Sequence, residues 1–180
     1  MSRNVRITLL CEDAQHITFA KKLLQALGWQ LRDFRIERSP SGRGSAEQFV
    51  RERFPIELRG LRSKRGEKAY LVVMIDGDDK GVAGRRASLN AACAAQQIRP
   101  PSEDDQVLVC VPTWNIETWL AYLDGEVVDE SKRDYPRLDR PRDCGPHIQA
   151  LAGMCSRDTL LPPSPPSLQD TCIQYRHVFR

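Results

Sequence analysis

The strongest constraint on the fold is a short apolar segment at residues 69–75, AYLVVMI, which stops at the acidic turn Asp76-Gly77-Asp78. Both faces of this segment are apolar, which is typical of a central strand in a parallel sheet with helices on both sides. The longest fully apolar run, residues 71–75, is far shorter than the roughly 18 residues of a membrane span. The segment therefore predicts the central strand of an α/β domain.

The segments around it alternate between strand-like and helix-like patterns. Short apolar or alternating runs predict further strands at residues 5–11, 29–38 and 106–111. Apolar periodicity and capping signals predict helices at residues 14–27, 84–97 and 116–123, and one from about residue 46 to 63 that ends or restarts at Pro55. Asp13, Ser45 and Asn115 are the expected N-caps. This order predicts an α/β, Rossmann-like fold with a mainly parallel four-stranded sheet flanked by helices.

Residues 125–180 differ in composition from the residues before them. They are polar and proline-rich, with proline pairs at 162–163 and 165–166, and they indicate one short helix near residues 147–155. A chain of 180 residues has the usual length of one domain. We therefore expect a domain at residues 1–124 and an irregular C-terminal extension at residues 125–180, packed on the same domain.

The cysteines allow two interpretations. Cys11, Cys93 and Cys110 lie in apolar segments, which favours buried thiols in a reducing compartment. The other cysteines lie near histidines, so that Cys144-x2-His147 and Cys172-x4-His177 could be halves of a zinc site, although no Cys-x2-Cys pair is present. The first residues lack the apolar core and cleavage site of a signal peptide, and we expect a cytoplasmic protein.

Acidic residues follow three of the predicted strands. Glu12 follows the first strand, Asp76 and Asp78 follow the third, and Glu117 comes shortly after the fourth. Ligands of parallel α/β sheets bind at the carboxyl ends of strands, where gathered carboxylates need a proton or a cation. Mg²⁺ or Mn²⁺ suits such oxygen ligands. We expect Glu12, Asp76 and Asp78 to hold the metal, with Asp79 as an alternate ligand.

The spacing of Asp76 and Asp78 also has a physical reason. Side chains two residues apart at a strand end point the same way, and Gly77 between them is expected to let the backbone turn and to leave room for a phosphate. Ordinary structural roles remain open. Asp-Gly is a common turn, and Glu12 and Glu117 could favour the dipole of the helix that follows each of them. His16 could carry a proton or contact phosphate, or be an exposed helix residue.

A basic segment indicates a phosphate-bearing partner. Residues 32–68 contain eleven Arg or Lys and six Asp or Glu, a local excess of 11 − 6 = +5, in a chain with a net charge of +3. A solvated, arginine-rich helix would have the same composition. We expect some of the basic residues of this segment, together with the lysine of the acidic turn, to contact the phosphates of nucleic acid. They are Arg43, Arg62, Lys64, Arg65 and Lys80.

The segments LLCE at residues 9–12 and VVMIDGD at residues 72–78 resemble the Toprim domain of topoisomerases, primases, recombination-repair proteins and OLD nucleases. The glycine that usually follows the glutamate is Asp13 here. The segment NIETWL at residues 115–120 is similar to small stand-alone Toprim-like proteins, including the RloB-like ones. The resemblance covers about residues 5–124, and nothing in residues 125–180 adds to it.

This resemblance implies a Mg²⁺- or Mn²⁺-dependent nuclease with Glu12, Asp76, Asp78 and Glu117 as its catalytic residues. It also implies a role in bacterial phage defence beside an ABC-type ATPase of the OLD or RloA kind. The alternative is a non-catalytic subunit that docks on the ATPase and senses a phage component. Phosphotransfer on free nucleotides is a third interpretation, against which the basic segment argues mildly.

Overall fold

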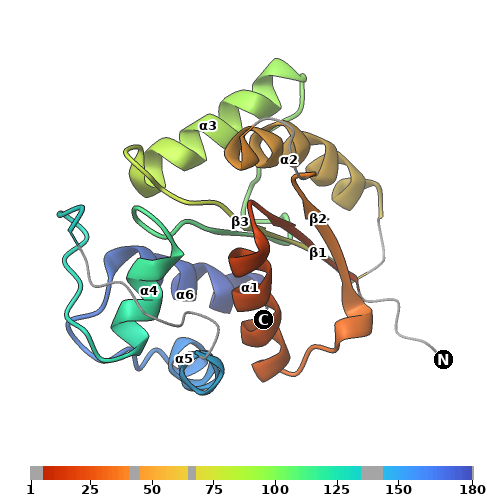
Figure 1. Cartoon of the computed structure of the whole chain (residues 1–180). Helices are drawn as coiled ribbons and strands as arrows, with labels where there is room; N and C mark the ends of the chain where they lie inside the picture. Colours follow the sequence, from red (N-terminus) through yellow and green to blue (C-terminus); the bar gives the residue numbers. More distant parts are fainter. Residues whose placement is uncertain (1–5, 41–44, 65–67, 135–143, 180) are drawn as a thin grey trace.

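The structure is a computed structural model that describes residues 6–40, 45–64, 68–134 and 144–179. Its centre is a sheet of β1 (Arg6–Cys11), β2 (Phe34–Arg38), β3 (Ala69–Met74) and β4 (Val107–Cys110). All neighbouring strands are parallel, and their order is β2-β1-β3-β4. The predicted α/β fold with a parallel four-stranded sheet flanked by helices is confirmed, and residues 69–74 form a central strand (Figure 1).

Helices connect the strands where the sequence predicted them. They are α1 (Ala14–Ala26), α2 (Ala46–Ser63), α3 (Gly81–Ala95) and α4 (Ile116–Leu123). The side chains of Asp13, Ser45 and Asn115 accept hydrogen bonds from backbone N–H groups in the first turns of α1, α2 and α4, which confirms the predicted N-caps. Pro55 does not interrupt α2. The buried side chains Val50, Phe54 and Leu58 hold both halves of this helix on the sheet.

Two differences concern the starts of elements. The second strand begins at Phe34 and not near Trp29, because Leu31–Asp33 forms a 3-10 turn in which Asp33 accepts the backbone N–H of Gln30 at 2.9 Å. Helix α3 begins at Gly81, before the predicted residue 84. Both differences lie at element ends, which the apolar pattern defines least well.

The sheet is covered on both faces. Figure 1 shows α2 and α3 on one side and α1, α4, α5 and α6 on the other. Phe54, Leu58 and Leu89 lie in the core on the α2 and α3 side, whereas Phe19 and Trp119 lie in the core on the opposite side. None of the helices in the described ranges is long and apolar enough to cross a membrane.

The C-terminal extension is more regular than the sequence indicated. It contains two helices, α5 (Gly145–Arg157) and α6 (Pro166–Val178), instead of one short one. Pro146 and Pro166 lie in the first turns of these helices, where a missing N–H costs nothing. Pro162 and Pro163 lie in the irregular connection between the two helices. Ile148, Leu151 and Leu168 belong to the same core as β1 and α1.

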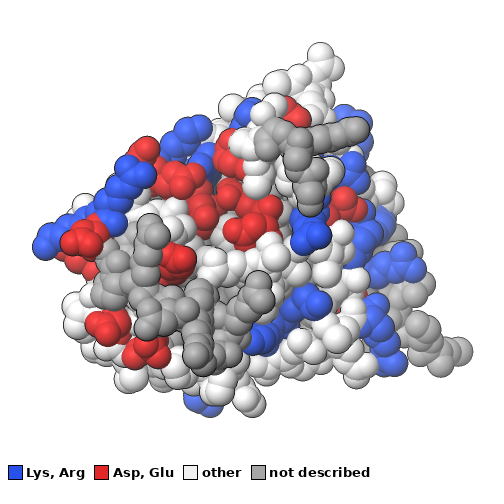
Figure 2. All heavy atoms as spheres, viewed as in Figure 1, with Lys and Arg blue, Asp and Glu red and all other residues white. Residues whose placement is uncertain are grey.

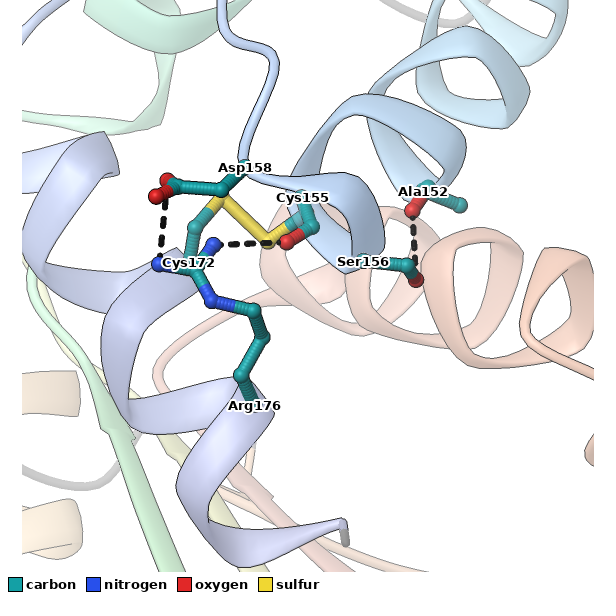
Figure 3. The surroundings of a disulfide bond; sticks show 6 residues. All are labelled: Ala152, Cys155, Ser156, Asp158, Cys172 and Arg176. Carbon is teal, nitrogen blue, oxygen red and sulfur yellow. Dashed lines mark hydrogen bonds and ion pairs between the residues drawn. A yellow bond between two sulfur atoms is a disulfide. The ribbon is translucent and has the colours of Figure 1, made fainter.

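A disulfide joins these two helices. Cys155 on α5 is bonded to Cys172 on α6, and both are buried. Figure 3 shows Arg176 beside this bond, donating to the carbonyl oxygen of Cys155 at 2.8 Å and pairing with Asp158 at 3.0 Å. The zinc interpretation is therefore wrong, because the Cys172 sulfur is already bonded.

The thiols in the apolar segments lie where the sequence predicted. Cys11, Cys93 and Cys110 are buried and form no disulfide.

Candidate acidic site at the carboxyl edge of the sheet

Two adjacent strands bring the principal acidic residues together. β1 and β3 are paired with Cys11 opposite Met74, so Glu12 and Asp76 emerge from neighbouring strands at the same edge of the sheet. Figure 2 shows acidic side chains gathered near the middle of the face seen in Figure 1. The predicted convergence of strand ends therefore occurs for β1 and β3.

Glu12 and Asp76 are in direct contact. The Oε1 atom of Glu12 accepts the backbone N–H of Asp76 at 3.2 Å, and both side chains are partly buried. Burial and the nearby charge of Asp76 raise the pKa of Glu12 to about 7, although His16 works in the opposite direction. A carboxyl group that holds its proton to neutral pH is one that a cation would stabilise in its ionised form.

His16 lies beneath this pair and is fully buried. Its Nε2 atom is 2.9 Å from Oδ1 of Asp76, and its backbone N–H donates to Oδ1 of Asp13, the cap of α1. Burial lowers the pKa of His16, but the hydrogen bond and charge of Asp76 outweigh burial, so the pKa is raised. The interpretation of His16 as an exposed helix residue is wrong. Its Nδ1 atom has no hydrogen-bond partner among the described residues.

Arg85 holds the acidic turn from the other side. This buried arginine of α3 donates from Nε to the backbone carbonyl of Asp76 at 2.6 Å and pairs with Oδ2 of Asp78 at 2.5 Å. A third contact joins it to Glu47 of α2 at 2.7 Å. Asp78 is otherwise 58% exposed. The sequence contained no signal for Arg85, because it lies in an ordinary helical segment.

Gly77 is needed for close backbone packing. A Cβ atom there would lie 2.8 Å from the carbonyl oxygen of Pro112, and the Gly77 N–H donates to that oxygen. The expectation that Gly77 leaves room for a phosphate is wrong, because the backbone of Pro112 and Thr113 fills that space. The contact instead fixes the acidic turn against the connection between β4 and α4.

The other two predicted acidic residues lie on different parts of the structure: one is largely exposed on the acidic turn, and the other lies on α4. Asp79 is 79% exposed and lies 3.7 Å from Arg133. Glu117 is partly buried in the first turn of α4, where its backbone N–H donates to the side chain of Asn115. Lys80 is exposed on the acidic turn, at the N-cap of α3.

Of the predicted phosphate contacts, Lys80 lies at this edge, whereas Arg62 and Lys64 do not. Arg62 and Lys64 end α2 just before β3 begins, which places them at the amino edge of the sheet. Arg62 donates to the Asp105 carboxylate at 2.7 and 2.9 Å and to the carbonyls of Arg99 and Pro100, and it lowers the pKa of Asp105 to about 2. This role is structural. Arg43 and Arg65 lie outside the described residues.

Within the described ranges, no three His, Cys, Asp or Glu side chains form a group arranged to hold a metal ion. A cavity of about 590 Å³ lies between β4, α3 and α6, with Leu89, Val109 and His177 in its lining and none of the predicted acidic residues. Asp105, which also lines this cavity, is paired with Arg62, whereas the acidic edge brings the carboxylates of Glu12 and Asp76 together.

Comparisons with protein-family models, with curated proteins and with solved structures found no match. Fold and site together define an α/β protein with a parallel sheet and a carboxylate pair at the carboxyl edge of two adjacent strands.

Proposed function

We propose that this protein is a Mg²⁺- or Mn²⁺-dependent hydrolase of nucleic-acid phosphodiesters. The observation that carries the proposal is the contact between Glu12 and Asp76, in which burial and like charge raise the pKa of Glu12 to about 7. Strongly perturbed carboxyl groups at the carboxyl edge of a parallel sheet are typical of functional sites. The Toprim-like pattern of residues 9–12 and 72–78 supports the same function.

The donor set fits a hard divalent cation. Mg²⁺ is commonly bound through one or two carboxylates together with water and substrate phosphate oxygens, and Glu12 and Asp76 supply two carboxylates. When bound, such an ion activates water and stabilises charge on a phosphoryl group. Asp78 would join them only after leaving Arg85, to which it is paired at 2.5 Å. Asp79, which is largely exposed, is the outermost candidate ligand.

The other residues of the site have positioning roles in this proposal. His16 holds the Asp76 carboxylate through Nε2, and Arg85 holds the backbone of the same residue. Buried hydrogen-bond partners of this kind keep metal-binding carboxylates in one orientation. Glu117 is the proposed general base, or a ligand of a second ion, on the first turn of α4.

The biological setting is part of the proposal and rests on the resemblance alone. The segment at residues 115–120 is similar to small Toprim-like defence proteins, which favours a bacterial anti-phage role beside an ABC-type ATPase. Phage nucleic acid in the cytoplasm would be the substrate.

A non-catalytic subunit that docks on such an ATPase is the second candidate, and one observation favours it. Arg85 neutralises Asp78, and His16 is hydrogen-bonded to Asp76, so part of the acidic charge is compensated by the protein's own side chains. A site of this kind can persist without a metal. Thermal stabilisation by Mg²⁺ separates the two candidates, because only a working metal site would give it.

The test of hydrolysis uses Glu12→Gln and Asp76→Asn beside a matched control. Glu52→Gln makes the same chemical change on the exposed face of α2. Wild type and E52Q are expected to cleave single-stranded DNA, duplex DNA or RNA with Mg²⁺ or Mn²⁺ and to stop with EDTA. E12Q and D76N are expected to lose at least about 100-fold in rate, the loss of one transition-state contact. Equal cleavage by D76N and wild type would overturn the proposal.

A further inference from the structure

Trp114 lies against the acidic turn, on the connection between β4 and α4. The backbone N–H of Asp78 donates to the carbonyl oxygen of Trp114 at 2.9 Å, and the two residues form an isolated antiparallel bridge. The indole is therefore carried by a backbone segment bonded directly to the proposed metal-binding turn.

Core packing does not account for this tryptophan. Trp29 and Trp119 belong to the hydrophobic core or pack on it, whereas Trp114 is in neither core cluster of the described residues. Its φ of +66° is one that bulky side chains rarely adopt, at a cost of about 1–3 kcal/mol. Asn or Gly would satisfy the backbone more easily. A ring kept in this position points to a role on the surface of the site.

The ring is held in one orientation. Its Nε1 donates to the carbonyl oxygen of Glu130 at 3.2 Å, and the Glu130 carboxylate in turn accepts the backbone N–H of Ser167 on α6 at 2.9 Å. The indole edge is thus anchored through Glu130 to a helix of the core. A fixed aromatic ring binds a planar partner with little loss of side-chain entropy.

One face of the ring receives a cation. The Arg133 guanidinium lies 5.7 Å from the ring centroid, and the Arg133 side chain is 78% exposed. The same arginine lies 3.7 Å from Asp79. The guanidinium covers this face, so a planar base would stack there in its place. The displaced Arg133, which is largely exposed, and the exposed Lys80 of the acidic turn could then contact phosphate.

We propose that the substrate is single-stranded nucleic acid, one base of which stacks on Trp114 while Arg133 and Lys80 contact its phosphates. This inference rests on the proposed function and names the substrate class of the same site. Base faces are free to stack on an aromatic side chain only where the strand is unpaired. A duplex would offer this surface its phosphates alone, without the contribution of the ring.

The test measures binding in the E12Q background, so that substrate is not consumed. The probes are an oligothymidylate and the duplex it forms with oligoadenylate. Trp114→Asn removes the ring and is compatible with the positive φ, Trp114→Phe keeps an aromatic ring, and Trp29→Phe is the control among the other aromatic residues. Thermal unfolding of each variant establishes that it is folded.

We expect oligothymidylate to quench tryptophan fluorescence and to bind W114N roughly 5- to 100-fold more weakly, the contribution of one stacked base. W114F should keep most of the affinity for oligothymidylate, and W29F should keep all of it. The duplex should bind more weakly, and W114N should not change its affinity. Equal binding of oligothymidylate with and without the Trp114 ring, or failure to bind, would overturn the inference. If E12Q binds through Trp114 but wild type does not hydrolyse the strand, the proposed function fails, and Trp114 remains a binding site for single strands without hydrolysis.

Discussion

His16 and Asp76 form a buried hydrogen bond that ties the first helix to the end of the third strand, with Nε2 and Oδ1 2.9 Å apart. His16 is fully buried, whereas the Asp76 side chain keeps 16% of its surface exposed. The contact joins residues 60 positions apart in the chain. The orientation of the Asp76 carboxylate therefore depends on the packing of α1 against β3 as well as on the strand that carries Asp76.

Replacing His16 tests this link. We expect His16→Ala to lower the free energy of unfolding by about 2–3 kcal/mol, because the Asp76 carboxylate loses a buried charge-assisted partner. Asp76→Asn in the same background should cost less than it does in wild type. Urea denaturation of the two single variants and the double variant measures the coupling. Additive losses would show that the hydrogen bond contributes no stability.

The raised pKa of Glu12 predicts how stability depends on pH. The folded protein keeps the Glu12 proton up to pH about 7, whereas an unfolded chain releases it near 4.5. The folded state therefore binds more protons in this window, and stability falls as the pH rises through it. The raised pKa of His16 acts in the same direction, since the stability it adds is lost as the pH rises through its folded value.

Glu12→Gln should flatten this profile. One pKa unit corresponds to about 1.4 kcal/mol of stability. Because Glu12 keeps some solvent contact, we expect the free energy of unfolding of E12Q to exceed that of wild type by only on the order of 1–2 kcal/mol at pH 8. At pH 4 the two should be similar. Thermal unfolding between pH 4 and 8 measures the difference. A wild-type profile parallel to that of E12Q would contradict the assignment of the proton to Glu12.

Mg²⁺ should raise the stability of wild type at pH 8, where we expect wild type to be less stable than E12Q. An ion that binds only the folded state at 100 times its dissociation constant adds about 2.7 kcal/mol. We expect this stabilisation in wild type and E52Q, and little of it in E12Q or D76N, because each of these variants loses one of the two carboxylates. Equal stabilisation of all four proteins would indicate weak binding elsewhere on the surface.

Arg85→Met should be the most destabilising change at the site. The buried guanidinium contacts three acceptors, Asp76, Asp78 and Glu47. Removing it takes the cationic partner from Asp78 and, among the described residues, leaves Glu47 with Arg51 alone. Losses from breaking a buried pair are about 3–5 kcal/mol. Asp78→Asn in the R85M background should recover part of that stability. Chemical denaturation measures both, and a loss under 1 kcal/mol in R85M would contradict the role given to Arg85.

The elements near the site were predictable because their signals are local. An apolar run that stops at Asp76, and the capping residues Asp13 and Asn115, depend on neighbours a few positions away. The convergence of Glu12 with Asp76 also followed from the sequence, since parallel strands end at a common edge.

The errors came from features that are not local. A count of charges along residues 32–68 could not tell that Arg62 would lie at the opposite edge of the sheet, bonded to Asp105. Prolines in the C-terminal extension indicated irregular chain, yet Pro166 begins α6, since the first turn of a helix needs no proline N–H.

The sequence by itself determined the α/β alternation, the strand ends and therefore the acidic edge. The apolar periodicity of each short segment predicts a helix or a strand, and parallel strands end at a common edge. Only the tertiary structure decided the partners of that edge. His16 comes from α1, Arg85 from α3 and Trp114 from the connection between β4 and α4, and the Cys155–Cys172 bond joins α5 to α6. Arg85 is only seven residues from Asp78, but the other contacts join residues far apart in the chain, and all of them depend on how the elements pack. A local sequence pattern does not specify such partners.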